Sequence, residues 1–383
     1  MSPFKVFDMK MPLILAALAA VQMPTRAAET KPFLETVRHH KTLASTIADN
    51  GDLNPYALIV APVSAGKIQK GDVLVDNFNG VANLQGTGVT IMDYRPSTKT
   101  MTQFTALPTD VPECPGGVGL STAMIMLQSG WIIVGSTPSQ DGTTRTMKPG
   151  GLLVLDDNGK LVDTWANTNI NDPWGNIAAI DQGTNAALFV SMAGLDVPGF
   201  QVRDPATGYP VTVKKSTVLR LDLTIPEGKP PVLASQTVVA GGFGQRADRD
   251  AFLVGPTGLA LAPDGTLYIS DALGNQIVAV PDAVNRTTSA GTGRVVTKDG
   301  LLRRPLAMFL APNGNLIVAN AKNGQAVEIN PATGQQICAQ WIDANQAQLP
   351  PGNGDLFGLA LKPDGRGFYY VEDDVNTLVE AVP

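Results

Sequence analysis

Acidic and amide side chains recur in this sequence where short apolar segments begin or end. Their oxygen atoms can accept hydrogen bonds from a polar ligand, and several together are the ligands that Ca²⁺ prefers. Imidazole chemistry has little support, because only 2 of the 383 residues are histidines. The sequence also lacks the Gly-x-Ser-x-Gly motif of a nucleophilic serine and the glycine-rich motifs that bind phosphates and dinucleotides. The candidates for binding a ligand or a metal are Asn54, Asp76, Asp172, Asn176, Asp271, Asn320, Asp355, Glu372 and Asp373.

One tryptophan and one pair of histidines are further candidates for a role in binding. Trp174 stands between Asp172 and Asn176, where its ring could stack on a ligand or pack between structural units. The adjacent His39 and His40 precede the repeated part of the chain. We therefore expect this pair in a solvated outer strand rather than at a metal.

The apolar segments that carry the polar candidates belong to an internal repeat. Its clearest copy runs from Gly255 to Val280 and contains an apolar strand, a Pro-Asp-Gly turn, a β-branched strand, a polar loop and a third strand. Two more copies occupy 304–329 and 357–381, and three weaker ones lie upstream. The second strands of the six copies are predicted to end at 77, 136, 192, 271, 320 and 372.

Six such units predict an all-β fold, a six-bladed β-propeller, because each small sheet must pack on its neighbours around an axis. A sandwich or a β-helix is the alternative. The last unit stops after its third strand, so we expect the N-terminal segment 42–47 to supply its outer strand and close the ring. Up-and-down strands then gather the polar candidates at one end, the mouth of the axial channel.

The stretch Val239–Asp271 and the following Asn275-Gln276-Ile277 resemble the NHL repeat. The segments Gly255–Ala260 and Pro263-Asp264-Gly265 carry most of this resemblance. The resemblance is strong over 240–280, fair over 300–383 and weak before 190. It implies a six-bladed propeller of the wider group that contains gluconolactonase-type, strictosidine-synthase-type and streptogramin-lyase-type enzymes.

This resemblance also implies a metal site, because gluconolactonase-type propellers hold a divalent ion with acid and amide residues at the mouth. The implied metal ligands are Asp271, Glu372 and Asp373, and the implied ion is Ca²⁺. Those enzymes favour Asn before a Gly-Leu or Gly-Ile strand, where this chain has Thr257 and Phe357. The alternative is that the aspartates closing second strands only cap turns. The candidates for ligand binding are Asn54, Asp76, Asp172, Trp174, Asn176 and Asn320.

The N-terminal residues 1–27 have the pattern of a secretory signal peptide. Lys5 and Lys10 precede an apolar run from Met11 to Val21, which is followed by small residues at a cleavage site. The mature chain, 28–383, is then a single propeller domain in a secreted or periplasmic location. The apolar run is too short to span a membrane, and no later run is longer. Cys114 and Cys338 fall in different units, so we expect no disulfide between them.

The second strands of the third and fourth copies are farther apart in the sequence than those of other neighbouring copies, because an insertion follows the second strand of the third copy. Residues 194–211 alternate apolar and polar types around an Asp-Pro-Ala-Thr-Gly turn, which predicts a hairpin projecting over the mouth. Phe200 and Tyr209 would then face a ligand or partner, and Arg203 would counter the acidic mouth. The formal charge of −6 argues against a nucleic-acid partner.

These patterns favour an exported module that binds a small molecule or a protein at the mouth. A Ca²⁺-dependent hydrolase of the lactonase or esterase type is the alternative. The sequence identifies no catalytic residue.

Overall fold

The structure is a computed structural model that describes residues 31–114, 116–354 and 356–383. The signal-peptide prediction for 1–27 and the candidate Asp355 therefore lie outside the described residues. Residues 32–383 form one compact unit. No helix within the described ranges is long and apolar enough to cross a membrane.

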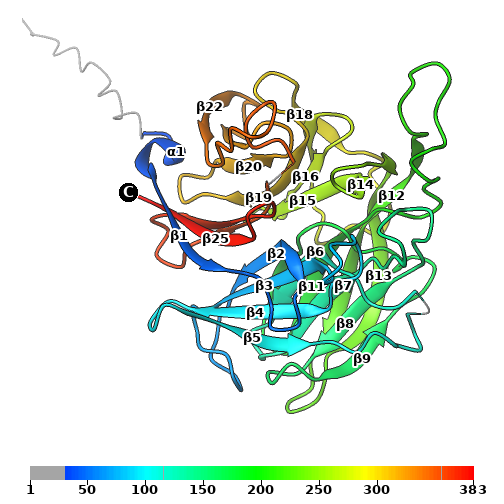
Figure 1. The fold of residues 1–383 in the computed structure, drawn as a ribbon, viewed down its shortest axis with the longest axis vertical. Helices are drawn as coiled ribbons and strands as arrows, with labels where there is room; N and C mark the ends of the chain where they lie inside the picture. The colour runs from blue at the N-terminus through cyan, green and yellow to red at the C-terminus, as the bar shows by residue number, and fades with distance from the viewer. Residues whose placement is uncertain (1–30, 115, 355) are drawn as a thin grey trace, which may run out of the picture. The chain divides into compact units, whose positions relative to one another are not determined.

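Six antiparallel sheets make up this unit. Five use only strands that are consecutive in the sequence, and the sixth adds an N-terminal strand to three consecutive ones (Figure 1). Blade 1 contains β2 (Leu53–Val60), β3 (Val73–Asn79), β4 (Thr90–Arg95) and β5 (Thr100–Ala106). Blade 2 contains β6 (Leu120–Met126), β7 (Ile132–Ser136), β8 (Gly151–Leu155) and β9 (Leu161–Trp165). Blade 3 contains β10 (Ala178–Asp181), β11 (Asn185–Met192), β12 (Val213–Thr224), β13 (Val232–Ala247) and β14 (Leu253–Val254).

The second half of the chain repeats the pattern. Blade 4 contains β15 (Pro256–Leu261), β16 (Leu267–Asp271), β17 (Gln276–Val280) and β18 (Arg294–Lys298). Blade 5 contains β19 (Pro305–Leu310), β20 (Leu316–Asn320), β21 (Gln325–Ile329) and β22 (Gln336–Trp341). Blade 6 contains β23 (Leu356–Leu361), β24 (Phe368–Glu372) and β25 (Thr377–Val382).

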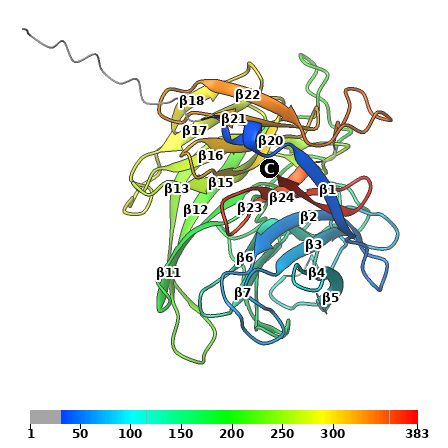
Figure 2. The same cartoon turned by 90° about the vertical axis from the view of Figure 1, so that its left-hand side faces the viewer.

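The blades follow one another around an axis, with their first strands innermost (Figures 1 and 2). Contacts join β2 to β6, β15 to β19, β19 to β23, and β23 back to β2. Blades 2 and 3 are joined by the Ser121 hydroxyl, which donates to the Pro173 carbonyl at 2.6 Å. The arrangement confirms the predicted six-bladed β-propeller.

The ring is closed by an N-terminal strand, as the sequence predicts, but the strand begins three residues and ends two residues earlier than the predicted 42–47. Strand β1 (His39–Ser45) pairs antiparallel with β25, from His39 opposite Val382 to Ser45 opposite Thr377. The short helix α1 (Phe33–Thr36) precedes it and packs against blade 5. There the buried Glu328 carboxylate accepts the Leu34 N–H at 2.9 Å, which anchors the start of the propeller domain.

The insertion between β11 and β12 is a hairpin. Arg203 pairs with Pro210, and the Val211 N–H donates to the Val202 carbonyl at 3.0 Å. The hairpin extends outward from the blades, as the green loop of Figure 1 shows. The predicted hairpin is confirmed, and its tip is exposed, with Tyr209 at 59%.

Candidate functional site

The mouth end of the propeller is defined by one strand register that recurs in five blades. It pairs Pro55 with Asn77, Leu120 with Ser136, Pro256 with Asp271, Pro305 with Asn320, and Leu356 with Glu372. A β-bulge follows each of these five pairs. In blade 3 the corresponding pair is an isolated bridge between Pro173 and Met192. The next residue of each first strand therefore occupies an equivalent position around the axis: Tyr56, Ser121, Trp174, Thr257, Leu306 and Phe357.

Large aromatic rings from these positions, from strand β3 and from the loop between β13 and β14 meet across the axis. The Tyr56 ring lies between the rings of Phe78 and Phe357, with centroid distances of 4.4 and 3.8 Å. The Trp174 ring stacks on Phe252 at 6.2 Å and meets Tyr56 edge-on at 6.0 Å. All five side chains are at most 2% exposed. We call these five residues the aromatic plug, because they belong to a buried cluster that joins blades 1, 3, 5 and 6.

Below the plug lies the axial channel, a cavity of about 550 Å³ lined by the first strands of all six blades. Its wall is mostly aliphatic, from side chains such as Leu58, Met124 and Leu259. The predicted ligand-binding residue Asn176 also lies here. Its amide donates to the Leu259 carbonyl at 2.8 Å and accepts the Leu259 N–H at 3.0 Å, so it joins blades 3 and 4.

Above the plug lies a second cavity of about 520 Å³, which we call the mouth pocket. Its wall comes from the ends of β2 and β3, from loops of blades 1, 2, 3 and 6, and from the segment that leads into blade 6. Residues of the 194–211 hairpin are not among those that line it, so the predicted position of that hairpin over the mouth does not hold for this pocket. The polar side chains of the mouth pocket are Asn54, Asn79, Asn83, Gln85, Arg249, Asp250, Gln348, Asn353, Asp373, Asp374 and Asn376.

Two buried asparagines of blade 1 are among the residues that line the mouth pocket. Asn54 and Asn79 are 7% and 3% exposed, and neither Oδ1 atom has a hydrogen-bond partner. Asn54 has a φ of 67°, a left-handed conformation that is unfavourable for most residues other than glycine. The Asn376 side chain holds it there by accepting the Asn54 N–H at 2.6 Å. Strained backbone and unpaired buried acceptors are features that cluster at binding sites.

Carboxyl groups of blade 6 give this side of the mouth a negative field. Burial, with smaller contributions from the charges of Asp343 and Asp374, raises the pKa of Glu372 to about 7, against a hydrogen bond from Thr377 that lowers it. The pKa of Asp374 is raised by burial and by Asp343, while hydrogen bonds, including one from Asn345, act in the opposite direction. Asp373, between them in the sequence, lines the mouth pocket.

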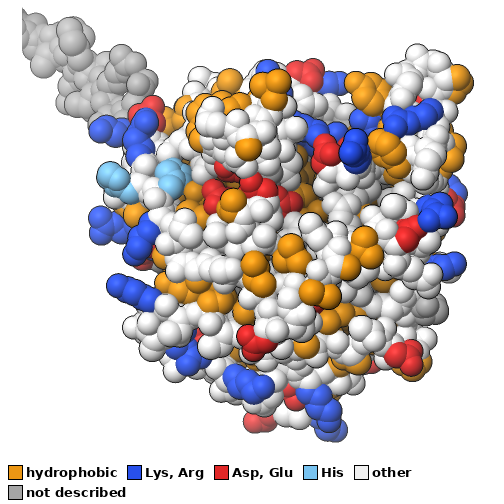
Figure 3. All heavy atoms as spheres, in the orientation of Figure 1, with side chains coloured by type: hydrophobic (Ala, Val, Ile, Leu, Met, Phe, Trp, Pro, Cys, Tyr) orange, Lys and Arg blue, Asp and Glu red, His pale blue; other side chains and the backbone are white. Residues whose placement is uncertain are grey.

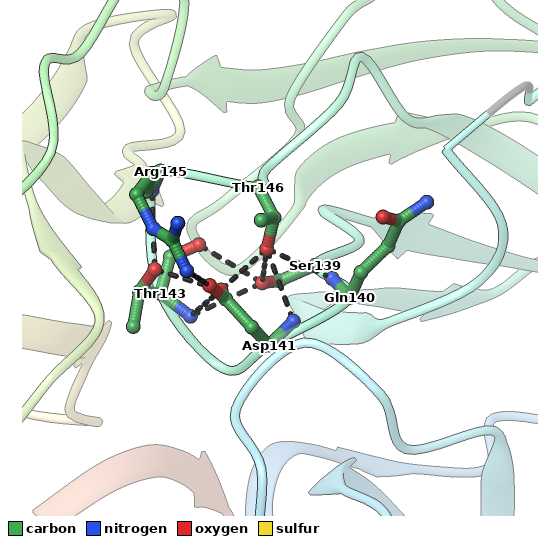
Figure 4. A network of polar contacts seen from close by, with 6 residues as sticks. All are labelled: Ser139, Gln140, Asp141, Thr143, Arg145 and Thr146. Carbon is green, nitrogen blue, oxygen red and sulfur yellow. Dashed lines mark hydrogen bonds and ion pairs between the residues drawn. The ribbon is translucent and has the colours of Figure 1, made fainter.

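The rim of the mouth pocket is fixed on the blade 2 side by a compact loop (Figure 4). The Asp141 carboxylate accepts hydrogen bonds from Thr143, Arg145 and Thr146. The bonds from Thr146 and Thr143, together with Arg145, lower the pKa of Asp141 to about 2. The network holds Gly142, which lines the pocket, close to Leu84 and Gln85 of blade 1.

Two of the predicted ligand-binding carboxyl groups are buried beneath the mouth. Asp76 is fully buried and accepts the Ala57 N–H at 2.7 Å through Oδ1. Asp172 is 2% exposed. Burial raises the pKa of both groups well above the ordinary range, against partial compensation by backbone hydrogen bonds. Neither Asp76 nor Asp172 is among the residues that line the mouth pocket.

The remaining predicted site residues make local structural contacts. Asn320 is buried, accepts the Arg303 N–H at 2.9 Å and donates to the Leu301 carbonyl at 2.9 Å. Trp174 belongs to the aromatic plug. The Asp271 carboxylate accepts the Gly274 N–H and the Gln276 amide, each at 2.9 Å, which is the pattern of a turn cap.

The implied calcium site does not fit these residues as they are arranged. Across the described ranges, no three or more His, Cys, Asp or Glu side chains come together in a way that could hold a metal ion. Asp271, Glu372 and Asp373 therefore do not form such a group. We derive no chemical step through a metal.

Sequence reasoning missed Tyr56, Phe78 and Phe252, which close the channel, and Asn79, which lines the mouth pocket. One signal in the sequence could have indicated the aromatic cluster: Phe357 occupies a position at which gluconolactonase-type enzymes favour Asn. Of the predicted residues that the structure describes, the mouth pocket brings together only Asn54 and Asp373.

The architecture defines the class of protein, a six-bladed β-propeller with a polar pocket above a plugged channel.

No protein-family model and no curated protein matches the sequence. Similar solved structures include a gluconolactonase from Xanthomonas campestris, with 13% identity, coverage of 91% of each chain and a TM-score of 0.54. A calcium-binding regucalcin from Agrobacterium tumefaciens has 14% identity, coverage of 88% of this chain and 93% of that one, and a TM-score of 0.51. A luciferin-regenerating enzyme has 13% identity, coverage of 90% and 95%, and a TM-score of 0.54. At these identities the similarity shows the fold alone.

Proposed function

We propose that this protein is an exported, NHL-like propeller that binds a small polar ligand in the mouth pocket. The observation that supports this most directly is the pair of buried, unpartnered amide oxygens of Asn54 and Asn79 beside a 520 Å³ cavity. A buried acceptor without a partner costs about 1–3 kcal/mol, and a ligand that donates to either oxygen recovers part of that cost once the side chain turns toward the pocket.

The aromatic plug supports binding at the surface of the propeller rather than inside the channel. It separates the mouth pocket from the aliphatic channel, so a ligand in the pocket is kept out of the channel. The rings are held by mutual packing in a fully buried cluster.

Thermal-shift screening of the whole mature chain with sugars, polyols, amino acids and amines tests this proposal. A ligand of the native state raises the melting temperature. For any such ligand, Asn54→Gly and Asn79→Ala should reduce the shift, since glycine accepts the left-handed backbone at 54. Asn185→Ala, an exposed residue at the opposite end, is the matched control. A shift that survives both mouth variants would show that the ligand binds elsewhere.

A hydrolase of the lactonase or esterase type is the second candidate. The observation in its favour is the pKa of Glu372, raised to about 7, which suits a general acid or base near neutral pH. Hydrolysis of aldonolactones and aryl esters should be measured with added Ca²⁺ and with EDTA, in the parent and in Glu372→Gln. Activity that is absent from the parent under both conditions rejects the hydrolase.

Export follows from the predicted leader 1–27 and has its own test. Expression of the full chain in a Gram-negative host should deliver a periplasmic protein whose mass corresponds to a start at residue 28. An intact, cytoplasmic chain would remove export from the proposal.

A further inference from the structure

A third cavity lies at the end of the propeller opposite the mouth pocket. Its volume is about 470 Å³, and it is lined by the four turns that join β6 to β7, β8 to β9, β10 to β11 and β12 to β13. We call it the turn pocket. It lies between blades 2 and 3, and it shares no lining residue with the mouth pocket or the axial channel. It is therefore a separate site.

The turn pocket contains a tryptophan that the repeat does not require. Trp131 closes the turn before β7, where its carbonyl accepts the Leu127 N–H at 2.8 Å. The same closing hydrogen bond occurs in the other five blades, and there the accepting residues are Asp72, Asn185, Thr266, Asn315 and Gly367. Five blades thus close this turn with a small or polar residue, and blade 2 carries a large aromatic ring in its place.

Trp131 is only partly buried. It packs against the core cluster between blades 2 and 3, which includes Leu127 and Ile225, and it also lines the turn pocket. Ile225 and Pro226 continue this apolar surface inside the cavity. The indole ring is therefore accessible to a molecule that enters the turn pocket.

Hydrogen-bonding side chains surround the apolar surface. The Asp156 Oδ1 atom accepts the N–H groups of Asn158 and Lys160, each at 2.9 Å, which fixes this carboxylate in the wall. An aromatic surface with a few polar groups around it is typical of small-molecule sites. The polar side chains of the turn pocket are Ser129, Asp156, Asp157, Thr184 and Glu227.

Hydrogen bonds between neighbouring blades hold these turns in place. The Asp181 carboxylate accepts the Gln128 N–H at 2.6 Å and the Gly183 N–H at 2.8 Å, which joins blades 2 and 3. The Lys67 N–H of blade 1 donates to the Asp157 carbonyl at 3.1 Å. The wall of the turn pocket is therefore preorganised, and a preorganised wall lowers the ordering cost of binding.

The charges around the turn pocket offset one another. Turns 156–160 and 225–229 together carry three carboxylates and two ammonium groups. A third ammonium group, that of Lys67, donates to the Asn158 carbonyl at 3.0 Å. Acidic and basic side chains are also mixed in the lower part of Figure 3, over blades 1 and 2. The balance of charges favours a neutral ligand over an ion.

We propose that the turn pocket binds a neutral carbohydrate whose ring packs on the indole of Trp131. The faces of a pyranose ring carry C–H groups that pack on an aromatic ring, while its hydroxyl groups donate to carboxylates at the edge. The cavity has room for about one or two sugar rings. The site is independent of the mouth pocket, so neither proposal depends on the other.

Saturation-transfer NMR and calorimetry of the whole mature chain test this proposal. The probes are maltose, cellobiose, lactose, mannobiose and chitobiose, neutral disaccharides that differ in their sugar units and linkage, each at up to about 20 mM. We expect at least one of them to bind. Tetramethylammonium is the cationic probe, since a cation can also pack on an indole ring, and we expect no binding of it.

Substitutions of Trp131 locate the site. Trp131→Thr introduces the residue that blade 4 carries at the equivalent position, and it should weaken sugar binding at least about tenfold. Trp131→Leu fills more of the space against the core and should weaken binding similarly, while Trp131→Phe keeps a ring and should retain most of it. The matched control is Trp341→Ala, which removes a 43% exposed tryptophan from β22 and should leave binding unchanged. Melting curves show which variants are folded.

Three results would overturn the inference. Absence of binding for all five disaccharides in the parent would reject a carbohydrate ligand. Sugar binding that survives in folded Trp131→Thr or Trp131→Leu but is lost in Asn54→Gly would place the sugar in the mouth pocket, which supports the proposed function and rejects this site. Binding of tetramethylammonium without binding of any sugar would make the turn pocket a cation site.

Discussion

The rings of Tyr56 and Phe357 stack with their centroids 3.8 Å apart and their planes at 16°. These residues are 301 positions apart in the sequence (357 − 56) and hold equivalent positions in the first and last blades. Their contact joins the two ends of the repeat on the axis, while β1 and β25 join them at the outer edge. The propeller is therefore closed twice, once by aromatic packing and once by strand pairing.

Removing a ring from the plug should destabilise the whole propeller. Phe357→Ala leaves a cavity between Tyr56 and the first strand of blade 6, and we expect a loss of about 3–5 kcal/mol in the free energy of unfolding. Phe357→Leu should cost less, because it fills part of the space. Urea denaturation measures both values.

The control for this prediction is Tyr209→Ala at the exposed tip of the hairpin. It removes an aromatic ring of similar size without opening a core cavity, so its effect should stay within about 0.5 kcal/mol. A loss below about 1 kcal/mol for Phe357→Ala would mean that the plug contributes little to stability.

Closure by the N-terminal strand predicts a large effect of truncation. Deleting residues 29–48 removes β1 and the buried side chains of Phe33, Leu34 and Val37, and it exposes the edge of β25. We expect a sharply lower melting temperature and a greater tendency to aggregate. Calorimetry and light scattering of the truncated chain measure these effects. An unchanged melting temperature would mean that the plug alone closes the ring.

Replacing the hairpin residues 196–212 by a short Gly-Ser linker should leave folding intact. The replaced segment buries Val197 and Pro210, and its other contacts with the blades are exposed: Lys215 pairs with Asp196, and the Arg246 guanidinium lies over the Tyr209 ring at 4.6 Å from its centroid. Exposed contacts of this kind contribute about 1 kcal/mol or less each. The melting temperature should fall by only a few degrees, and a collapse of the fold would show that the hairpin is structural.

The six-bladed fold was predictable because its signals are local. Strands β7, β11, β16, β20 and β24 end at the predicted positions 136, 192, 271, 320 and 372, and β3 continues to Asn79 instead of ending at 77. Turn residues and apolar segments decide these ends within a few neighbours in the sequence. The closing strand was predictable too, since an unpaired edge has to be covered.

The site was less predictable, because its contacts join residues that are far apart in the sequence. Nothing near Phe252 in the sequence indicates that its ring meets Phe78 and Trp174 across the axis. Asp271 illustrates the opposite case. Its position after a strand suggested a metal ligand, but the nearby Gly274 N–H and Gln276 amide occupy its carboxylate. Local turn chemistry accounts for such an aspartate without a ligand.

His40 makes the stability of the ring closure depend on pH. The Gln340 amide donates to its Nε2 at 3.0 Å, and its Nδ1–H donates to the Tyr370 hydroxyl at 3.0 Å, which in turn donates to the Ile342 carbonyl. These contacts require a neutral ring, and burial, with a contribution from His39, lowers the pKa of His40. The unfolded chain then binds a proton more readily, so this contribution to stability is lost as pH falls below about 6.5.

The measurement compares urea unfolding of the parent and of His40→Gln between pH 7.5 and 5. The parent should lose stability relative to the variant as pH falls through this range. His39→Gln serves as the control, because His39 is exposed in the same strand and should follow the parent. Parallel pH curves for the parent and His40→Gln would contradict the role of the neutral ring.

Glu372 should have the opposite effect on stability in an overlapping range of pH. Its pKa rises from 4.5 in the unfolded chain to about 7 in the folded one, chiefly through burial, so the folded state holds the proton more tightly. Stability is then greatest at low pH and falls as pH rises from about 4.5 to 7, by about 1–2 kcal/mol after allowance for solvent screening. Glu372→Gln keeps the shape and removes the titration, so the variant should be the more stable of the two at pH 7.5.

Urea denaturation of the parent and of Glu372→Gln at pH 4.5, 6 and 7.5 measures the difference, with the exposed Glu227→Gln as control. If the difference between Glu372→Gln and the parent does not change with pH, the carboxyl is ionised throughout and cannot act as a proton donor near neutrality.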